Sequence, residues 1–173
     1  LKYISTSRIE NATKLAQKYK DCTGTNDLDV IGKDNDVKGV FVCTSPSSHF
    51  AIVKKLLSFQ KNVFVEKPPC KSLLELEELI HLSKNNEVVV GVQKRYSNIN
   101  SILKSKLKNA ISYNGKYLTG AYPEGDELLD IFIHPIDNCV YLFGDIKDLI
   151  SKKVVSGSGV TYFITLEHTS GVV

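Results

Sequence analysis

Two short apolar runs that flank an amphipathic helix constrain the fold of this 173-residue chain more than any other feature. Residues 40–43 read VFVC and residues 62–65 read NVFV, and between them residues 49–59 place apolar side chains at helical spacing. Continuous apolar strands are typical of parallel sheets whose two faces are both covered. The pattern therefore predicts a parallel sheet with a helical crossover between these two strands.

The alternation of strand and helix continues on both sides of this unit. Strands are predicted at residues 2–6, 40–43, 62–65 and 87–92, and helices at residues 9–20, 49–59 and from Ser72 onward, with a short helix or loop at 27–33. Ser72 and Glu75 have the spacing of a capping box, which marks the start of a helix. Such alternation predicts an α/β fold with a doubly wound parallel sheet.

The second half of the chain has a different pattern, and we place the boundary near residues 93–98. A polar helix is expected at residues 98–108, a strand at 113–118, a long helix at 127–143 that stops at Gly144, and antiparallel strands at 154–155 and 160–167. Helices followed by antiparallel strands predict a partial α+β domain with an open sheet.

The composition excludes several classes of protein. The net charge is only +3, and acidic and basic residues are interspersed, so we expect no nucleic-acid partner. No apolar run approaches the roughly 20 residues that span a bilayer, so we expect no membrane partner. Four scattered cysteines predict a reducing, cytoplasmic location. Because the chain starts at Leu1 and contains no methionine, we expect residues to precede it.

A hydroxyl-rich turn, residues 44–49, follows the first of the two apolar strands. Ligands of open α/β sheets bind beyond the carboxyl ends of the strands. Hydroxyl groups at the start of a helix suit a phosphate or a ribose there. A capped helix without a ligand is the alternative interpretation.

Residues 66–68 bring a charged pair directly to the end of the second apolar strand. Pro68 disfavours the helical conformation for Lys67 and holds it in extended backbone. A lysine at this position is predicted to face a ligand. An ordinary Glu–Lys pair on a surface loop is the alternative.

A polar stripe interrupts the long apolar helix of the second half. Asp130 and His134 are four residues apart and share a helical face, and Asp137 follows His134 by three residues. A carboxylate one turn from a histidine can orient it as a general base. Pro135 predicts a kink just after the histidine. One alternative is a histidine that is buried in the core and hydrogen-bonded there. A metal site is the other alternative, and it ranks below both the catalytic and the core interpretation, so no metal is predicted.

A basic and aromatic group, Lys94, Arg95 and Tyr96, follows the strand at residues 87–92. It could supply a cation and an aromatic ring to a substrate. Basic residues are also common beyond strands that bind nothing.

Together these motifs resemble the Gfo/Idh/MocA family of NAD(P)-dependent sugar and polyol oxidoreductases. The family's Glu-Lys-Pro motif matches residues 66–68. Its Thr-Pro-Asn–His turn, which follows a strand, matches Thr44, Ser45, Pro46 and His49, with an insertion or shift of one residue. Its Asp-x-x-x-His-x-x-Asp helix matches residues 130–137, and its basic pair resembles residues 94–96. The family's first strand and glycine-rich turn are not present.

The resemblance implies a Rossmann-type dinucleotide-binding domain over residues 1–95, lacking its first strand, and a partial substrate and oligomerisation domain over residues 96–173. We expect a homo-oligomer that forms through the sheet of the second domain. The implied cofactor contacts are Ser7, Arg8, Thr44, Ser45, Pro46, His49, Glu66 and Lys67. The implied substrate contacts are Arg95, Tyr96 and Asp137.

The residues that follow the strand predicted at residues 2–6 indicate the preferred cofactor. Family members that use NAD usually carry an acidic residue at this position, where it binds the ribose 2′-hydroxyl. This chain has Ser7 and Arg8, a combination that favours a 2′-phosphate and hence NADP over NAD.

The resemblance also implies a mechanism, in which a hydride passes between the cofactor and a secondary alcohol or ketone of a sugar, cyclitol or polyol. His134 takes the hydroxyl proton, Asp130 orients His134, and Lys67 stabilises the reacting oxygen. Lys67 and His134 should then face one cleft. A dinucleotide-binding sensor without turnover and a reductase of non-sugar carbonyl compounds are the alternatives.

Overall fold

The computed structural model describes residues 1–120, 128–157 and 159–173. Contacts within the chain divide it into two units, Leu1–Gly91 and Val92–Val173, and each is described by itself.

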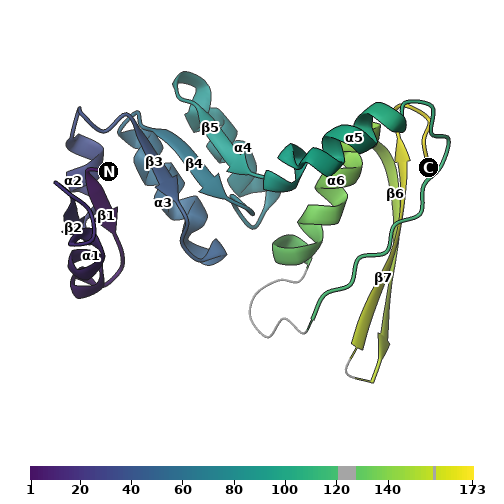
Figure 1. Ribbon diagram of the computed structural model, residues 1–173, viewed down its shortest axis with the longest axis horizontal. Helices are drawn as coiled ribbons and strands as arrows, with labels where there is room; N and C mark the ends of the chain where they lie inside the picture. Colours follow the sequence, from purple (N-terminus) through teal and green to yellow (C-terminus); the bar gives the residue numbers. More distant parts are fainter. Residues whose placement is uncertain (121–127, 158) are drawn as a thin grey trace. The chain divides into compact units, whose positions relative to one another are not determined.

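The first unit alternates strands and helices in the order expected for an α/β fold (Figure 1). Its elements are β1 (Tyr3–Ser5), α1 (Ile9–Ala16), β2 (Thr23–Thr25), α2 (Leu28–Lys33), β3 (Gly39–Val42), α3 (Pro46–Ser58), β4 (Asn62–Glu66), α4 (Leu73–Leu82), η1 (Ser83–Asn85) and β5 (Val88–Gly91). All of its strand pairs are parallel, in the ladders β1–β2 and β3–β4–β5. Within the described residues no ladder joins β1 to β3.

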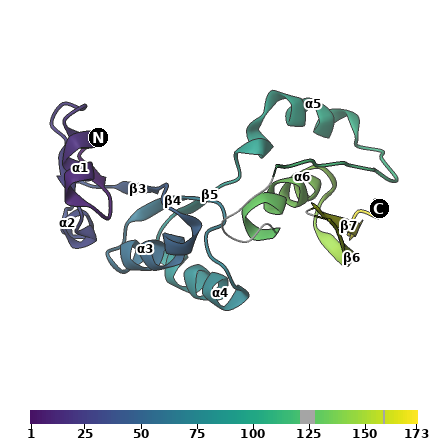
Figure 2. The same ribbon diagram turned by 90° about the horizontal axis from the view of Figure 1, so that it is seen from below.

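The β3–β4–β5 sheet and its two helices form the core of the first unit. Figure 2 shows α3 and α4 on the same side of the three strands. Alternate strand residues point to these helices, so Val42, Val63 and Val65 are buried against Val53 and other apolar side chains of α3 and α4. Burial of each such side chain stabilises the fold by about 1.5–3 kcal/mol. This packing fixes the end of β4, where Glu66 and Lys67 lie.

The opposite face of this sheet remains open in the first unit. Phe41, Phe64 and Val89 are aligned across the three strands on that face. The Phe41 ring packs against the Phe64 ring in a tilted arrangement, with 5.2 Å between the ring centroids, and Phe41 is still 77% exposed. The sheet is therefore covered by helices of this unit on one face only.

The loop between α2 and β3 ties the starts of β1 and β4 together. Asp34 accepts hydrogen bonds from the Tyr3 hydroxyl and pairs with Lys2 at 2.7 Å. The buried ammonium group of Lys61 donates to the backbone carbonyls of Asp34 and Val37 at 2.7 and 3.0 Å. The loop thus links the two parallel ladders of the unit at their amino ends.

The second unit packs two helices beside a long β-hairpin. Its elements are η2 (Gln93–Tyr96), α5 (Asn98–Lys106), a π-helical turn η3 (Leu128–Phe132), α6 (Ile133–Phe143), β6 (Ile146–Ser156) and β7 (Gly159–His168). β6 and β7 pair antiparallel along nearly their whole length (Figure 1). Leu166 is buried, and the Phe132 ring meets the Tyr162 ring at 5.2 Å, so η3 contacts the hairpin.

Several elements differ from the sequence expectations. β6 begins at Ile146, whereas a strand was expected only at residues 154–155. β2 was not expected, because its three residues carry no apolar pattern and pair with β1 through the backbone. Residues 113–118 form no strand. Instead, Tyr113 holds this segment by stacking on Phe143 at 4.3 Å and by hydrogen bonding to His168 Nε2 at 3.0 Å.

The long helix expected at residues 127–143 divides into η3 and α6, and its expected start at Glu127 lies outside the described residues. The irregular turn precedes Pro135, whereas the sequence predicted a kink after His134. Pro135 is the third residue of α6 and so lies in its first turn, where proline is tolerated better than in a helix interior. Gly144 ends the helix with φ of 96°, as expected.

None of the helices in the described part of the chain combines the length and the apolar character needed to cross a membrane.

Candidate active site

The turn after β3 presents several hydroxyl groups to solvent. Thr44, Ser45 and Ser47 are exposed. Ser48 Oγ lies within hydrogen-bond distance of both Thr44 Oγ1 and the Ser45 carbonyl oxygen, at 2.8 Å from each. Ser45 is the N-cap of α3, but its side chain makes no capping hydrogen bond and lies 3.2 Å from Ser47 Oγ. Ser45 Oγ is therefore not committed to the helix end, in contrast to the capped-helix alternative. Pro46 occupies the first turn of α3.

Glu66 and Lys67 lie at the carboxyl end of β4 and are half-buried. Glu66 pairs with Gly91 of β5, and a Cβ atom at Gly91 would come within 3.2 Å of the Glu66 carboxylate. The glycine therefore leaves the space in which this carboxylate lies. The next peptide bond, Lys67–Pro68, is cis, and Pro68 is buried.

His49 lies in the first turns of α3, and its side chain is only 1% exposed. Its Nδ1 lies 2.7 Å from the Pro68 carbonyl oxygen, and its Nε2 lies 3.0 Å from the Thr44 carbonyl oxygen. The ring thus connects the turn after β3 with the segment that follows Lys67.

Ser7 and Arg8 follow β1 and are both exposed. Thr6 Oγ1 donates to the Arg8 carbonyl at 2.6 Å and shapes this turn. Arg8 has extended backbone at the N-cap position of α1, and its side chain makes no capping hydrogen bond. β1 belongs to the two-stranded ladder, whereas Thr44 and Lys67 follow strands of the three-stranded one.

In the second unit, Asp130 is buried within η3 and His134 is half-buried in the first turn of α6. Asp130 was predicted on the same helical face as His134, and both lie in consecutive helical turns.

Asp137 and Arg95, two predicted substrate contacts, pair with each other. Arg95 Nε lies 3.0 and 2.9 Å from the two carboxylate oxygens, and Arg95 Nη2 lies 2.5 Å from Oδ1. The hydrogen bond with Asp137 raises the pKa of the guanidinium, although burial opposes this. The pair fixes α6 against η2. Tyr96, the third predicted contact, is 79% exposed.

Further polar contacts extend this attachment along α6. Asn100 Nδ2 donates to the side chain of Asn138 at 2.5 Å and to the Lys94 carbonyl at 2.6 Å. The Lys104 ammonium lies 4.0 Å from the centroid of the Tyr141 ring. No local sequence pattern predicts these contacts, because 38 residues separate the two asparagines.

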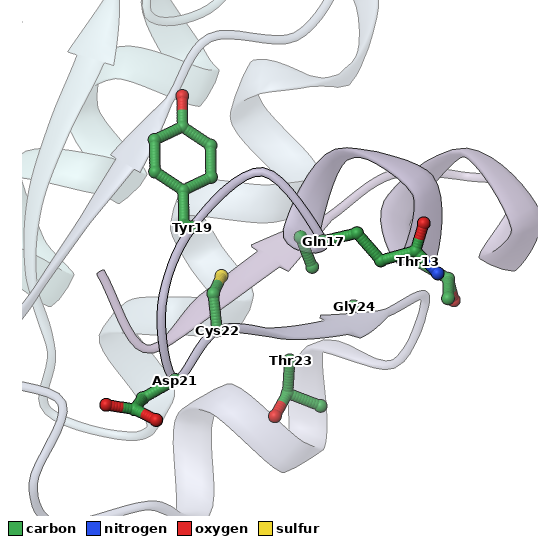
Figure 3. A pocket seen from close by; sticks show the side chains of 8 residues that line it. Thr13, Gln17, Tyr19, Asp21, Cys22, Thr23 and Gly24 are labelled. Atoms are coloured by element: carbon green, nitrogen blue, oxygen red, sulfur yellow. The ribbon is translucent and has the colours of Figure 1, made fainter.

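Two other features, possible metal-binding groups and a surface hollow, were compared with the predicted site residues. Among the described residues, no group of three or more His, Cys, Asp or Glu side chains could hold a metal ion. An open hollow of about 490 Å³ lies between α1 and β2, where Thr13, Gln17, Asp21 and Thr23 are among the lining residues (Figure 3). None of the predicted site residues lines it.

The chain matches known oxidoreductases. The family model GFO_IDH_MocA, "Oxidoreductase family, NAD-binding Rossmann fold", matches residues 1–94. A putative oxidoreductase, YceM, from Salmonella typhimurium is 33% identical over 68% of this chain and 40% of the relative. The inositol 2-dehydrogenase/D-chiro-inositol 3-dehydrogenase of Lacticaseibacillus casei is 30% identical over 65% of this chain and 36% of the relative.

A solved structure has the same fold. GenD2 from gentamicin A biosynthesis, crystallised in complex with NAD, superimposes with a TM-score of 0.77 at 19% identity, over 99% of this chain and 56% of that one. The chain spans 36–40% of the length of the two curated relatives and 56% of the length of GenD2. The family model matches more than half of the chain, and the parallel ladders, the crossover helices and the Glu-Lys-Pro strand end agree with it. The chain therefore belongs to the Gfo/Idh/MocA family of oxidoreductases with an NAD-binding Rossmann fold.

Proposed function

We propose that the chain is part of a nicotinamide-dependent enzyme that oxidises a secondary alcohol, or reduces the ketone, of a sugar, cyclitol or related polyol. One observation carries the proposal. In a chain of an NAD-binding family, adjacent parallel strands end in exposed hydroxyls at Thr44 and Ser45 and in the pair Glu66–Lys67. The inositol dehydrogenase relative supports the substrate class.

The donor groups of the first unit fit a dinucleotide. Hydroxyls at Thr44 and Ser45, beside Pro46, would hold phosphate or ribose oxygens near the start of α3. The exposed Ser7 and Arg8 would hold a 2′-phosphate, so NADP is the proposed cofactor in preference to NAD. Glu66 would hold the nicotinamide side of the cofactor. When bound, the nicotinamide ring accepts or supplies the hydride.

The protein's own residues handle the proton and the charge on the reacting oxygen. Lys67 donates a hydrogen bond to this oxygen and stabilises its negative charge as the hydride leaves the carbon. His134 accepts the hydroxyl proton, and the buried Asp130 orients the imidazole. In the reverse direction His134 returns the proton. The joint action of Lys67 and His134 on one substrate is part of this proposal.

Tyr96 is the proposed substrate contact with the most available surface. Arg95 and Asp137 would contact the substrate through the edges of their ion pair, since the two groups already satisfy much of each other's hydrogen bonding.

Variants of the full-length protein test these roles. Lys67→Ala and His134→Ala should each lower kcat by about 10²–10⁴-fold, the usual contribution of a positioned acid–base or electrostatic group. Cofactor affinity should change little. Residues that act on one transition state are non-additive, so the double variant should lose much less than the product of the two single losses. Multiplicative losses, or wild-type turnover in either single variant, would contradict the mechanism.

A second copy of the chain is the proposed partner. Ile150 and Phe163 are exposed on the outer face of the hairpin, on the same side as Val154. An apolar row of this kind on a two-stranded ribbon favours burial against another surface. Phe163→Glu should therefore reduce the molar mass measured by light scattering to that of a monomer, and an unchanged mass would exclude this face as the interface.

A further inference from the structure

His49 is a buried polar side chain that contacts two backbone segments of the candidate site. Its ring is 1% exposed, so it has no surface to offer a cofactor. The family resemblance implies a cofactor contact for His49. The structure instead places both ring nitrogens against backbone carbonyl oxygens, at Pro68 and at Thr44.

Both partners of the ring can only accept hydrogen bonds. A neutral imidazole donates from one nitrogen, and an imidazolium donates from both. Nδ1 has the shorter contact, 2.7 Å to the carbonyl of Pro68, and Nε2 lies 3.0 Å from the carbonyl of Thr44. The ring therefore connects the first residue of the hydroxyl turn, which follows β3, with Pro68, the residue that directly follows Lys67 beyond the end of β4.

We propose that His49 is a positioning residue that holds Lys67 in its catalytic place through the Pro68 carbonyl, and holds the hydroxyl turn through the Thr44 carbonyl. This inference rests on the proposed function of Lys67. Pro68 follows Lys67 directly, so a shift of its carbonyl group moves the lysine backbone. A misplacement of about 1 Å in a catalytic group can cost about 10²-fold in rate.

The two contacts can be separated by two substitutions. The amide nitrogen of asparagine occupies about the position of Nδ1, and that of glutamine about the position of Nε2. His49→Asn therefore keeps the contact with Pro68 and loses that with Thr44. His49→Gln keeps the contact with Thr44 and loses that with Pro68. His49→Phe keeps an aromatic ring at this buried position and loses both contacts.

Kinetics of the full-length protein provide the first measurement. His49→Gln and His49→Phe should lower kcat about 10–100-fold. His49→Asn should mainly raise the KM for the cofactor, with a smaller loss of kcat. In a Lys67→Ala background, His49→Gln should cause little further loss of kcat, because the lysine that it positions is gone. The exposed His81 of α4 supplies the matched control, and His81→Gln should leave all constants unchanged.

Cysteine labelling tests the same contacts without any turnover. Cys70 is buried two residues after Pro68, and burial raises the pKa of its thiol, so it should react slowly with a thiol reagent. His49→Gln should accelerate labelling of Cys70 at least several-fold, and His49→Asn should leave it slow. The exposed Cys43 reports the reagent's activity in every sample.

The outcomes separate this inference from the proposed function. An inactive wild-type protein would overturn the proposed function, while the labelling pattern would still support or overturn the His49 contacts. Equal kcat values and equal Cys70 labelling in His49→Asn and His49→Gln would overturn the positioning role. So would a full, multiplicative loss from His49→Gln in the Lys67→Ala background, because it would indicate general structural damage.

Discussion

At the scale of single residues, Asp34 is the point where charge and fold are most closely connected. Its carboxylate contacts Tyr3 of β1 and Lys2, which precedes this strand, and its backbone carbonyl accepts from Lys61, which directly precedes β4. The hydrogen bonds from Lys2, Tyr3 and the Asp36 backbone lower the pKa of this carboxyl to about 2. The ionisation of the Asp34 carboxyl is thus connected to the arrangement of the parallel strands, because the same residue contacts the starts of two of them.

This lowered pKa predicts a specific acid dependence of stability. A carboxyl whose folded pKa lies below its ordinary value of 3.8 stabilises the fold fully above that value. The contribution disappears as the pH falls from about 4 through about 2. Asp34→Asn should therefore lower the free energy of unfolding at pH 7, and the difference from wild type should shrink below about pH 4 and disappear below about pH 2. Urea unfolding at a series of pH values measures it, and a difference that stays constant down to pH 2 would contradict the assignment.

At the same scale, the residue types of the candidate site were predictable, but their partners were not. Spacing and strand-end position were enough to single out Glu66, Lys67 and the hydroxyl turn. Spacing could not show that His49 would be buried between two carbonyls, because the Pro68 contact spans 19 residues. The Arg95–Asp137 pair spans 42 residues and likewise has no local signature.

At the scale of elements, α6 is held to η2 and α5 by polar contacts. Arg95→Ala should lower the free energy of unfolding by about 1.5–3 kcal/mol, the range for hydrogen bonds to charged groups, because Asp137 is left largely buried without its partner. Arg95→Lys should lose an intermediate amount, since lysine keeps the charge without the two-pronged geometry.

The Lys147–Glu167 pair on the hairpin is the matched control for this prediction. Both of its side chains are more exposed than those of Arg95 and Asp137. Lys147→Ala should therefore cost less than about 1 kcal/mol by denaturant unfolding. Equal losses in Arg95→Ala and Lys147→Ala would show that the first pair does not hold α6 in place.

The helix starts provide a second pair of matched variants. Ser72 Oγ accepts from the Glu75 backbone N–H at 3.2 Å, and Glu75 accepts from the Lys71 backbone N–H at 2.7 Å. Ser72→Ala should lower the free energy of unfolding by about 1 kcal/mol. Ser45→Ala should cost much less, because the Ser45 side chain makes no capping bond to α3. The same loss in both variants would contradict the role of the Ser72 cap.

Elements with a strong local pattern were predicted well from the sequence. The apolar runs of β3 and β4, the capping box of α4 and the glycine stop of α6 each have a local physical cause. The strand expected at residues 113–118 was wrong, since Tyr113 is held by ring stacking and by hydrogen bonds with His168 and Val173. β2 was missed because its backbone pairing with β1 leaves no apolar signature.

At the scale of the whole molecule, the sequence predicted an α/β unit followed by a helical and antiparallel one, and both are present. The fold of the first unit follows from strand and helix periodicity. The exposed face with Phe41 and Val89 has no such explanation within the unit, because local patterns show which residues are apolar but not what covers them.

The central claim is hydride transfer between a nicotinamide cofactor and a secondary alcohol or its ketone. The most direct test is the absorbance of reduced nicotinamide when the full-length protein is mixed with NADP or NAD and a panel of sugars, cyclitols and polyols. The account predicts formation of the reduced cofactor with at least one of these compounds, at a higher kcat/KM with NADP than with NAD. Binding of the cofactor without turnover on any alcohol, or on any ketone in the reverse direction, would contradict it.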